Sequence, residues 1–172
     1  MDGNSFRIYR GRFTLLELPE ALAGVCQGEP VGPGWYRRVA GPSLAMGGLG
    51  GWWGKEFDGQ GGIDNLLERD GALRRTLRGE VRRADSLVDG KPCLRIVYVK
   101  GSRLPWARIV DELRHMEEGE LLGMMVLNIS WLPYLAFPFA LHARKHQVAG
   151  GVQKSEISKI QISSVDVIGG LE

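Results

Sequence analysis

Short stretches in which apolar and polar residues alternate, separated by turn-forming residues, make up most of the second half of the chain. Alternation with a period of two is typical of a β-strand with one buried face, and Asp89-Gly90 is a strong hairpin signal. Connections of only a few residues between such stretches predict an antiparallel meander. The strands are predicted over residues 51–58, 77–88, 93–100, 106–115, 120–128 and 135–144.

The first third of the chain has a different pattern. Thr14 followed by Glu17 resembles a capping box, and leucines at helical spacing follow it, so a helix is predicted over residues 15–26. Prolines and glycines argue against a long regular element over residues 27–46. Beyond the first predicted strand, residues 64–68 fit one or two helical turns.

A run of hairpins either remains an open sheet or closes into a barrel, which removes the exposed edges. The many glycines and the sparse helix favour closure. We therefore expect a mainly β fold, an antiparallel up-and-down β-barrel with one or two short N-terminal helices. A length of 172 residues fits a single domain over residues 1–172. In it, residues 1–46 form a helix and loop, residues 47–146 the barrel strands, and residues 147–172 a last strand or a tail.

Glycine is the unusual feature of the composition, with 25 residues in the chain, well above the roughly 7% of average usage. It is concentrated in residues 47–57, where it surrounds two adjacent tryptophans. Successive residues of a strand point to opposite faces, so Trp52 and Trp53 are predicted to point in opposite directions. One of them should lie in the core, and the other should be exposed, covered by the N-terminal helix or turned toward a ligand.

The formal net charge of +2 and the pI near 8.6 are too mild to indicate a nucleic-acid partner. Six arginines occur between Arg69 and Arg83, but acidic residues lie among them and no aromatic residue does. A solvated strand face is therefore favoured over a phosphate or carboxylate site, and a stacking platform for single-stranded nucleic acid is not indicated.

We expect a cytoplasmic protein with no membrane partner. The N-terminal residues are charged and lack the apolar run of a signal peptide. The longest apolar region, residues 124–143, is interrupted by Pro133 and Pro138, which favours strands or a loop over a spanning helix. Cys26 and Cys93 have no metal-site spacing and are predicted to be free thiols.

The segment 50–57 resembles the GXWXG motif of a family of small bacterial and fungal proteins, because glycines at positions 50 and 54 flank Trp52 and Lys-x-Phe follows. The resemblance continues through residues 64–67, 111–114 and 121–124. That family is similar to the calycins, the up-and-down β-barrels that include lipocalins, fatty-acid-binding proteins and haem-binding nitrobindins. In calycins the Gly-x-Trp strand typically starts the barrel, whereas here about fifty residues precede it. The resemblance implies a ligand inside the barrel.

An eight-stranded barrel holds either packed side chains or one small ligand. A plain apolar core explains the inward-facing residues as well as a ligand cavity does, and the two alternatives stay open. If there is a cavity, its ligand-binding residues are predicted to be Trp52, Trp53, Arg95, Tyr98, Trp106, Met125, Phe137 and Phe139.

Asp111 is the strongest candidate for chemistry, because alternation places it on the same face as Ile109 and Leu113. A carboxylate on an apolar face needs a cation or hydrogen-bond donors, or its pKa rises. Facing a cavity, Asp111 could act as a general acid or base together with Tyr98 or Arg95 on the preceding strand. The favoured alternative is a structural ion pair with an arginine such as Arg114, or an assignment of the strand face that is wrong by one residue.

His142 follows apolar residues on the last predicted strand and is similar in place to the late-strand histidine that ligates haem in nitrobindins. Haem requires little more than one axial ligand and an apolar slot, but a lone histidine is usually structural, and this one alternates away from Phe139 and Leu141. No cofactor is expected, with haem on His142 as the alternative. His115 and His146 have no spacing with it that would suggest zinc.

Three functions follow from these observations. The first is binding of an apolar or amphipathic small molecule. The second is a cofactor-free cyclase or isomerase that uses Asp111 or Tyr98 for proton transfer, and the third is haem binding through His142. The sequence does not decide whether the protein is an enzyme or whether it forms a homodimer.

Overall fold

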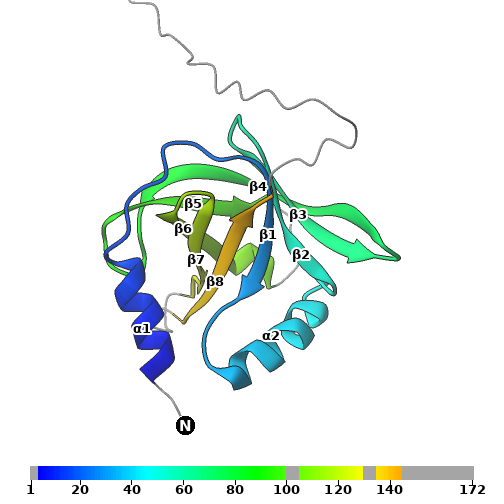
Figure 1. Cartoon of the computed structure of the whole chain (residues 1–172), viewed down its shortest axis with the longest axis horizontal. Helices are drawn as coiled ribbons and strands as arrows, with labels where there is room; N and C mark the ends of the chain where they lie inside the picture. Colours follow the sequence, from blue (N-terminus) through cyan, green and yellow to red (C-terminus); the bar gives the residue numbers. More distant parts are fainter. Residues whose placement is uncertain (1–3, 100–104, 130–134, 145–172) are drawn as a thin grey trace, which may run out of the picture.

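The residues that alternate in the sequence form a closed antiparallel barrel of eight strands (Figure 1). The structure is a computed structural model and describes residues 4–99, 105–129 and 135–144. Each strand pairs with its neighbours in the chain, and the last strand pairs with the first, so the predicted fold class is confirmed. The strands are β1 (Ala23–Pro30), β2 (Trp52–Asp58), β3 (Gly62–Arg69), β4 (Ala72–Asp85), β5 (Pro92–Tyr98), β6 (Ile109–Glu117), β7 (Glu120–Leu127) and β8 (Ala136–Ala143).

Two apolar clusters hold the barrel together, one on each side of the sheet. The inner cluster consists of alternate strand residues such as Ile96, Leu113 and Leu141, which are fully buried. The outer cluster packs Phe13 against outward-facing residues of β5, β6 and β7, among them Leu122. The sheet is thus buried on both faces where the N-terminal segment covers it, and on one face elsewhere.

Two helices lie at the same end of the barrel in Figure 1. They are α1 (Asn4–Phe13) and α2 (Gly34–Met46), and a short 3-10 helix, η1 (Trp106–Arg108), precedes β6. Helix α2 contains Pro42, yet it forms because Tyr36 and Ala40 are buried against the barrel. The expectation of no long regular element over residues 27–46 is therefore wrong, since tertiary burial outweighs the low helix propensity of the segment.

The helix predicted over residues 15–26 is also wrong. The helix ends at Phe13 instead, and the Thr14 hydroxyl donates to the carbonyl of Gly11 at 2.7 Å, so Thr14 follows a helix rather than starting one. Leu15 is 82% exposed, whereas Leu18 and Leu22 are partly buried against the inner cluster from a segment that is not helical. The barrel begins with β1, inside the region expected to hold only a helix and loop.

Residues 64–68 lie in β3, not in helical turns. Ile63, Asn65 and Leu67 alternate onto the inner face, while β2 and β4 pair with the strand on either side. The last strand or tail predicted over residues 147–172 lies outside the described residues.

The glycine and tryptophan segment forms the start of β2 and contains a bulge. The register slips between the pairs Trp52–Leu67 and Gly54–Leu66, so Trp53 is the extra residue. The bulge places Trp52 on the inner face and Trp53 outside, where the Arg144 guanidinium lies 5.4 Å from the Trp53 ring. A Cβ atom on Gly54 would lie 2.0 Å from the Cys26 carbonyl oxygen, so only glycine allows β1 to approach β2 here.

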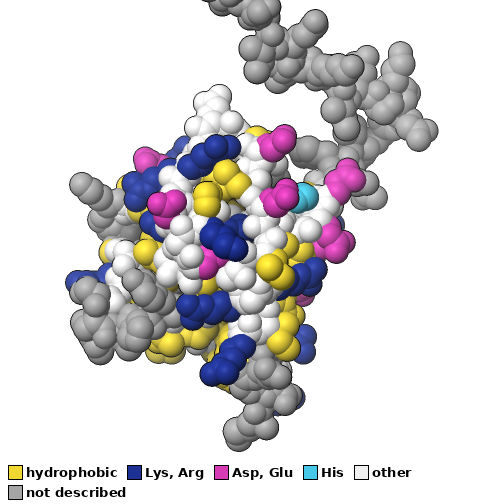
Figure 2. Space-filling view, turned by 90° about the vertical axis from the view of Figure 1, so that its left-hand side faces the viewer, with side chains coloured by type: hydrophobic (Ala, Val, Ile, Leu, Met, Phe, Trp, Pro, Cys, Tyr) yellow, Lys and Arg dark blue, Asp and Glu magenta, His cyan; other side chains and the backbone are white. Residues whose placement is uncertain are grey.

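The arginines of β4 are exposed, as predicted for a solvated strand face. Arg75 forms a bidentate pair with Glu56, and Arg78 pairs with Asp58 and Asp64. The face shown in Figure 2 likewise intersperses basic, acidic and apolar side chains. Among the described residues, no helix is long and apolar enough to cross a membrane.

Candidate functional site

A cavity of about 380 Å³ lies inside the barrel at the end that α2 covers. Its wall is mostly aromatic and aliphatic, and α2 closes one side with a row of residues at helical spacing. The lining residues are Pro30, Trp35, Tyr36, Val39, Ala40, Ser43, Leu44, Leu49, Trp52, Lys55, Asn65, Tyr98, Pro105, Trp106, Ile109, Asp111, Met125, Phe137 and Phe139.

Four polar side chains meet on this wall and form what we call the inner polar cluster, Lys55, Asn65, Tyr98 and Asp111. They come from β2, β3, β5 and β6, and all point inward because each occupies an inner position of its strand. Lys55 and Asn65 are direct partners across β2 and β3, while Asp111 lies opposite Ile96, two residues before Tyr98. The barrel thus brings together side chains from two separate strand pairs.

Lys55 is the centre of the inner polar cluster and is 2% exposed. Its ammonium group lies 2.8 Å from Asp111 Oδ2 and donates to Asn65 Oδ1 at 2.9 Å and to the Tyr98 hydroxyl at 3.0 Å. An ammonium group has three donors, so these contacts use all of them. The rings of Trp52, Tyr98 and Phe139 lie 5.5–5.7 Å from the nitrogen and add cation–π contacts.

The Asp111 carboxylate is used on one side only. Its Oδ2 accepts a 2.6 Å hydrogen bond from the Tyr98 hydroxyl as well as the contact with Lys55. Within the described residues, no buried side-chain nitrogen or oxygen lacks a hydrogen-bond partner. Asp111 Oδ1 accepts no hydrogen bond among these residues, so it cannot be one of the fully buried atoms. It is therefore accessible from the cavity that Asp111 lines.

Burial also changes the acidity of the tyrosines near Asp111. Burial, and then the negative charge of Asp111, raise the pKa of Tyr98 well above its ordinary value of 10.0. The same two causes, in the same order, raise the pKa of Tyr36 on α2. Both phenols are therefore neutral near pH 7 and can act as hydrogen-bond donors.

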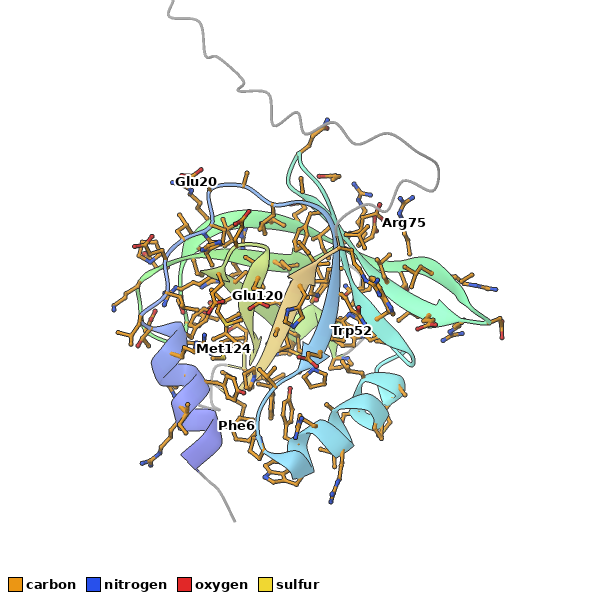
Figure 3. The ribbon with its side chains drawn as sticks, viewed as in Figure 1. Phe6, Glu20, Trp52, Arg75, Glu120 and Met124 are labelled. Carbon is orange, nitrogen blue, oxygen red and sulfur yellow. The ribbon has the colours of Figure 1, made fainter. Side chains whose placement is uncertain are left out.

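A group of four aromatic side chains, Phe6, Trp35, Tyr36 and Phe137, closes the cavity between the two helices and β8. The Tyr36 ring stacks on Phe137 with centroids 5.7 Å apart, and Phe6 makes edge contacts with Trp35, Tyr36 and Phe137. The side chain of Phe6, a residue of α1, lies between α1 and α2 in Figure 3. Since Trp35 is 55% exposed, this group reaches from the cavity to the surface.

Most of the residues predicted to contact a ligand do line the cavity. The structure brings Asp111 and Tyr98 into direct contact, and Trp106 is fixed by its indole N–H, which donates to the Gly47 carbonyl at 2.5 Å. The other predicted residues that line the cavity are Trp52, Met125, Phe137 and Phe139.

Two predicted contacts lie elsewhere and are corrected. Trp53 is outside because of the bulge. Arg95 is also outside, since it occupies an outward position of β5 and pairs with Glu112 at 2.9 Å. The favoured ion pair between Asp111 and Arg114 is wrong as well, because Arg114 points outward from β6 and Lys55 takes its place.

His142 lies on the outer surface of β8, away from the cavity. Its ring nitrogens are 3.1 Å from a Glu120 oxygen and 3.4 Å from a Glu29 oxygen, and its side chain is 40% exposed. It therefore cannot ligate a haem held inside the barrel. Among the described residues, no three His, Cys, Asp or Glu side chains are grouped to hold a metal ion.

Sequence reasoning missed Lys55 and Asn65. Lys55 lies in a strand that was predicted, but the bulge at Trp53 hid its inward direction. Asn65 was hidden by its wrong assignment to a helical turn. The alternation of Asn65 with Ile63 and Leu67, and of Lys55 with Phe57, was the signal that could have placed both on the inner face.

A second set of buried charges lies on the outer face of β6 and forms the outer polar cluster. Glu112 accepts hydrogen bonds from the Ser86 hydroxyl at 2.5 Å, the Leu87 amide at 2.8 Å and the Arg95 guanidinium. Arg114 forms a bidentate pair with Asp89 at 2.7 and 2.8 Å. It also donates to three backbone carbonyls, those of Phe13, Lys91 and Pro92, and stacks over the Phe13 ring.

The barrel is similar to one solved structure, a crystal structure of a protein from Thermomonospora curvata. The TM-score is 0.56 at 16% sequence identity, and the match covers 77% of this chain and 83% of that chain. A likeness at this identity shows the shared fold alone. No protein-family model and no curated protein matches the chain, so the GXWXG resemblance stays a prediction from its motif.

Proposed function

We propose that this protein binds a small, mostly apolar molecule inside its barrel. The observation that supports the proposal is an apolar cavity of about 380 Å³ with a single polar cluster on its wall. Cavities with a hydrophobic lining and a few fixed polar groups are the usual form of small-molecule sites. Ligand pockets typically have volumes of roughly 300–1,000 Å³, and this cavity falls within that range.

We further infer that the barrel is of the calycin type. The eight-stranded up-and-down closure and the Gly-Trp segment at the start of β2 support this assignment. Trp52 packs edge-on against Phe139 across the interior, with ring centroids 6.0 Å apart. The strand that precedes β2 is the main departure from the calycin pattern.

Uptake of an uncharged fluorescent probe, N-phenyl-1-naphthylamine, tests the binding proposal. Met125 lines the cavity, so Met125→Trp should fill part of it and weaken probe binding at least tenfold. Met46 is 91% exposed and outside the lining, so Met46→Trp adds the same side chain without that effect. Equal probe binding by both variants would contradict an internal site.

Proton-transfer catalysis on the bound molecule is the second candidate function. It is supported by the 2.6 Å hydrogen bond between Tyr98 and Asp111, and by the carboxylate oxygen that opens onto the cavity. A general base needs such an oxygen within reach of the substrate. A cofactor-free isomerase or cyclase would use Asp111 as the base and would need no metal.

Native mass spectrometry of protein from its own host identifies any retained molecule and so separates the two candidates. The purified molecule is then incubated with wild type and with Asp111→Asn. Catalysis predicts a product isomer with wild type and none with Asp111→Asn, while both remain folded. An unchanged molecule after incubation with wild type leaves binding as the function.

A further inference from the structure

The hydrogen-bond donors around the cavity are almost all in use. The three donors of Lys55 go to Asn65, Tyr98 and Asp111, and the Tyr98 hydroxyl donates to Asp111. The Trp52 indole N–H donates to Asn65 Oδ1 at 3.1 Å, and Asn65 itself is fully buried behind it. At the inner polar cluster, a ligand that needs to accept a hydrogen bond therefore meets donors that already have partners.

The indole and phenol donors on the remaining walls are occupied in the same way. The Trp106 indole N–H donates to the Gly47 carbonyl, and the Tyr36 hydroxyl donates to the Pro138 carbonyl at 3.3 Å. Ser43 on α2 is an exposed residue at the rim. A carboxylate ligand inside the cavity would thus lose its water shell without finding an available cation or N–H.

Unlike the donors, one hydrogen-bond acceptor on the cavity wall has no partner in the part of the chain that the structure describes. Asp111 Oδ1 opens onto the cavity and accepts no hydrogen bond from the described residues. A buried carboxylate oxygen gains most from a donor. A cationic ammonium ligand is nevertheless disfavoured, because the Lys55 ammonium lies 2.8 Å from the same carboxylate. The group that satisfies both conditions is a neutral donor.

We propose that the ligand carries a neutral hydroxyl group, as an alcohol or phenol does, and donates it to Asp111 Oδ1, with its apolar body among the aromatic side chains. This inference rests on the proposed function and specifies the ligand class. It sets this cavity apart from sites that hold a carboxylate on free basic side chains. A site built around one hydrogen bond rejects analogues that lack it far more strongly than an apolar pocket rejects a missing methylene.

Four compounds that share a ten-carbon chain test the proposal by displacement of N-phenyl-1-naphthylamine at pH 8. They are 1-decanol, its methyl ether, decanoate and decylammonium. We expect 1-decanol to bind at least tenfold more tightly than the ether, which cannot donate, and about a hundredfold more tightly than either ion. Equal or tighter binding of the ether or of decanoate would overturn the proposal while leaving small-molecule binding intact.

If neither the probe nor any of the four compounds binds, the proposed function fails, and this inference fails with it. The wild-type series is decisive by itself, so it does not depend on the folding of any variant. Variants then identify the atoms responsible.

Tyr98→Phe removes an acceptor from Lys55 and leaves one ammonium donor free for a ligand. We expect this variant to bind decanoate about tenfold more tightly than wild type does. Asp111→Asn presents an amide to the cavity and should abolish the preference for 1-decanol over its ether. Met125→Ala is the matched control, because it changes an apolar wall residue and should shift all four affinities alike. If Asp111→Asn keeps the preference for 1-decanol over its ether, Asp111 is not the group that accepts a hydrogen bond from the ligand.

Discussion

Strand β6 carries buried charges on both of its faces, and the two sets differ in how completely they are paired. On the outer face, Glu112 and Arg114 make hydrogen bonds through both carboxylate oxygens and all three guanidinium nitrogens. On the inner face, Asp111 uses Oδ2 twice, while Oδ1 opens onto the cavity. The outer polar cluster has the properties of a structural clamp, and the inner one has capacity left for a ligand.

The partners of the two clusters point to the same difference. Arg114 joins the end of α1 to the turn between β4 and β5, so its contacts fix elements of the fold relative to one another. Lys55 joins side chains that are already held by the sheet. Buried charge alone therefore does not identify a site, and an incompletely paired group facing a cavity is the more informative observation.

Loss of Arg114 should give one of the two largest losses of stability, and loss of Lys55 the other. Arg114→Met leaves Asp89 partly buried without its cation, and breaking such a pair typically costs about 3–5 kcal/mol of the free energy of unfolding. Urea denaturation measures that loss, and Arg83→Met, at an exposed position of β4, should stay within about 0.5 kcal/mol of wild type. If Arg114→Met lowers the free energy of unfolding by less than about 1 kcal/mol, the outer polar cluster is not a structural clamp.

The inner ion pair should be replaceable without the full loss of stability. Lys55→Met leaves the Asp111 carboxylate buried without its cation and should lower the free energy of unfolding by about 3–5 kcal/mol. By contrast, replacing both members of a buried ion pair with apolar residues often changes the stability little. We expect the double variant Lys55→Met/Asp111→Leu to be more stable than Lys55→Met by about 2 kcal/mol, as measured in urea. It should still bind the naphthylamine probe but lose the preference for 1-decanol. A double variant less stable than the single one would assign the inner pair to the structural clamp.

The smallest effect concerns pH. The hydrogen bond from Arg114, helped by the backbone amide of Lys91, lowers the pKa of Asp89. A lowered pKa in the folded state stabilises the protein above the ordinary carboxyl pKa of about 4, and this contribution is lost as the pH falls through the folded value. Urea titrations between pH 6 and pH 2.5 should show the difference between wild type and Asp89→Asn shrinking toward low pH. A constant difference would show that the carboxylate charge of Asp89 contributes nothing.

The strands after residue 90 could be predicted because their inner positions are consistently apolar apart from Asp111. Alternation was sufficient to place Asp111 and Tyr98 on inner faces, and the structure puts them in contact. The closed barrel was predicted from short connections and abundant glycine. These properties are local, and a single sequence displays them directly.

The features that were missed depend on contacts between distant segments. β1 has no apolar alternation because its inner position Gly28 must be small, since a Cβ there would lie 2.3 Å from the Trp52 ring. The bulge at Trp53 shifts the alternation of β2, which hid the inward direction of Lys55. Helix α2 exists because it is buried on the barrel, despite its proline.

The pairing of β1 with β8 has a consequence for the order in which the protein folds. The other seven strand pairings join neighbours in the chain, whereas this one joins Cys26 to Ala143 across nearly the whole described length. Contacts between such distant residues carry the largest loop-closure entropy and slow folding. Because β8 supplies Phe137 and Phe139 to the cavity, we expect the ability to bind a ligand to appear in the slowest phase of refolding, after the β2–β7 hairpins have formed.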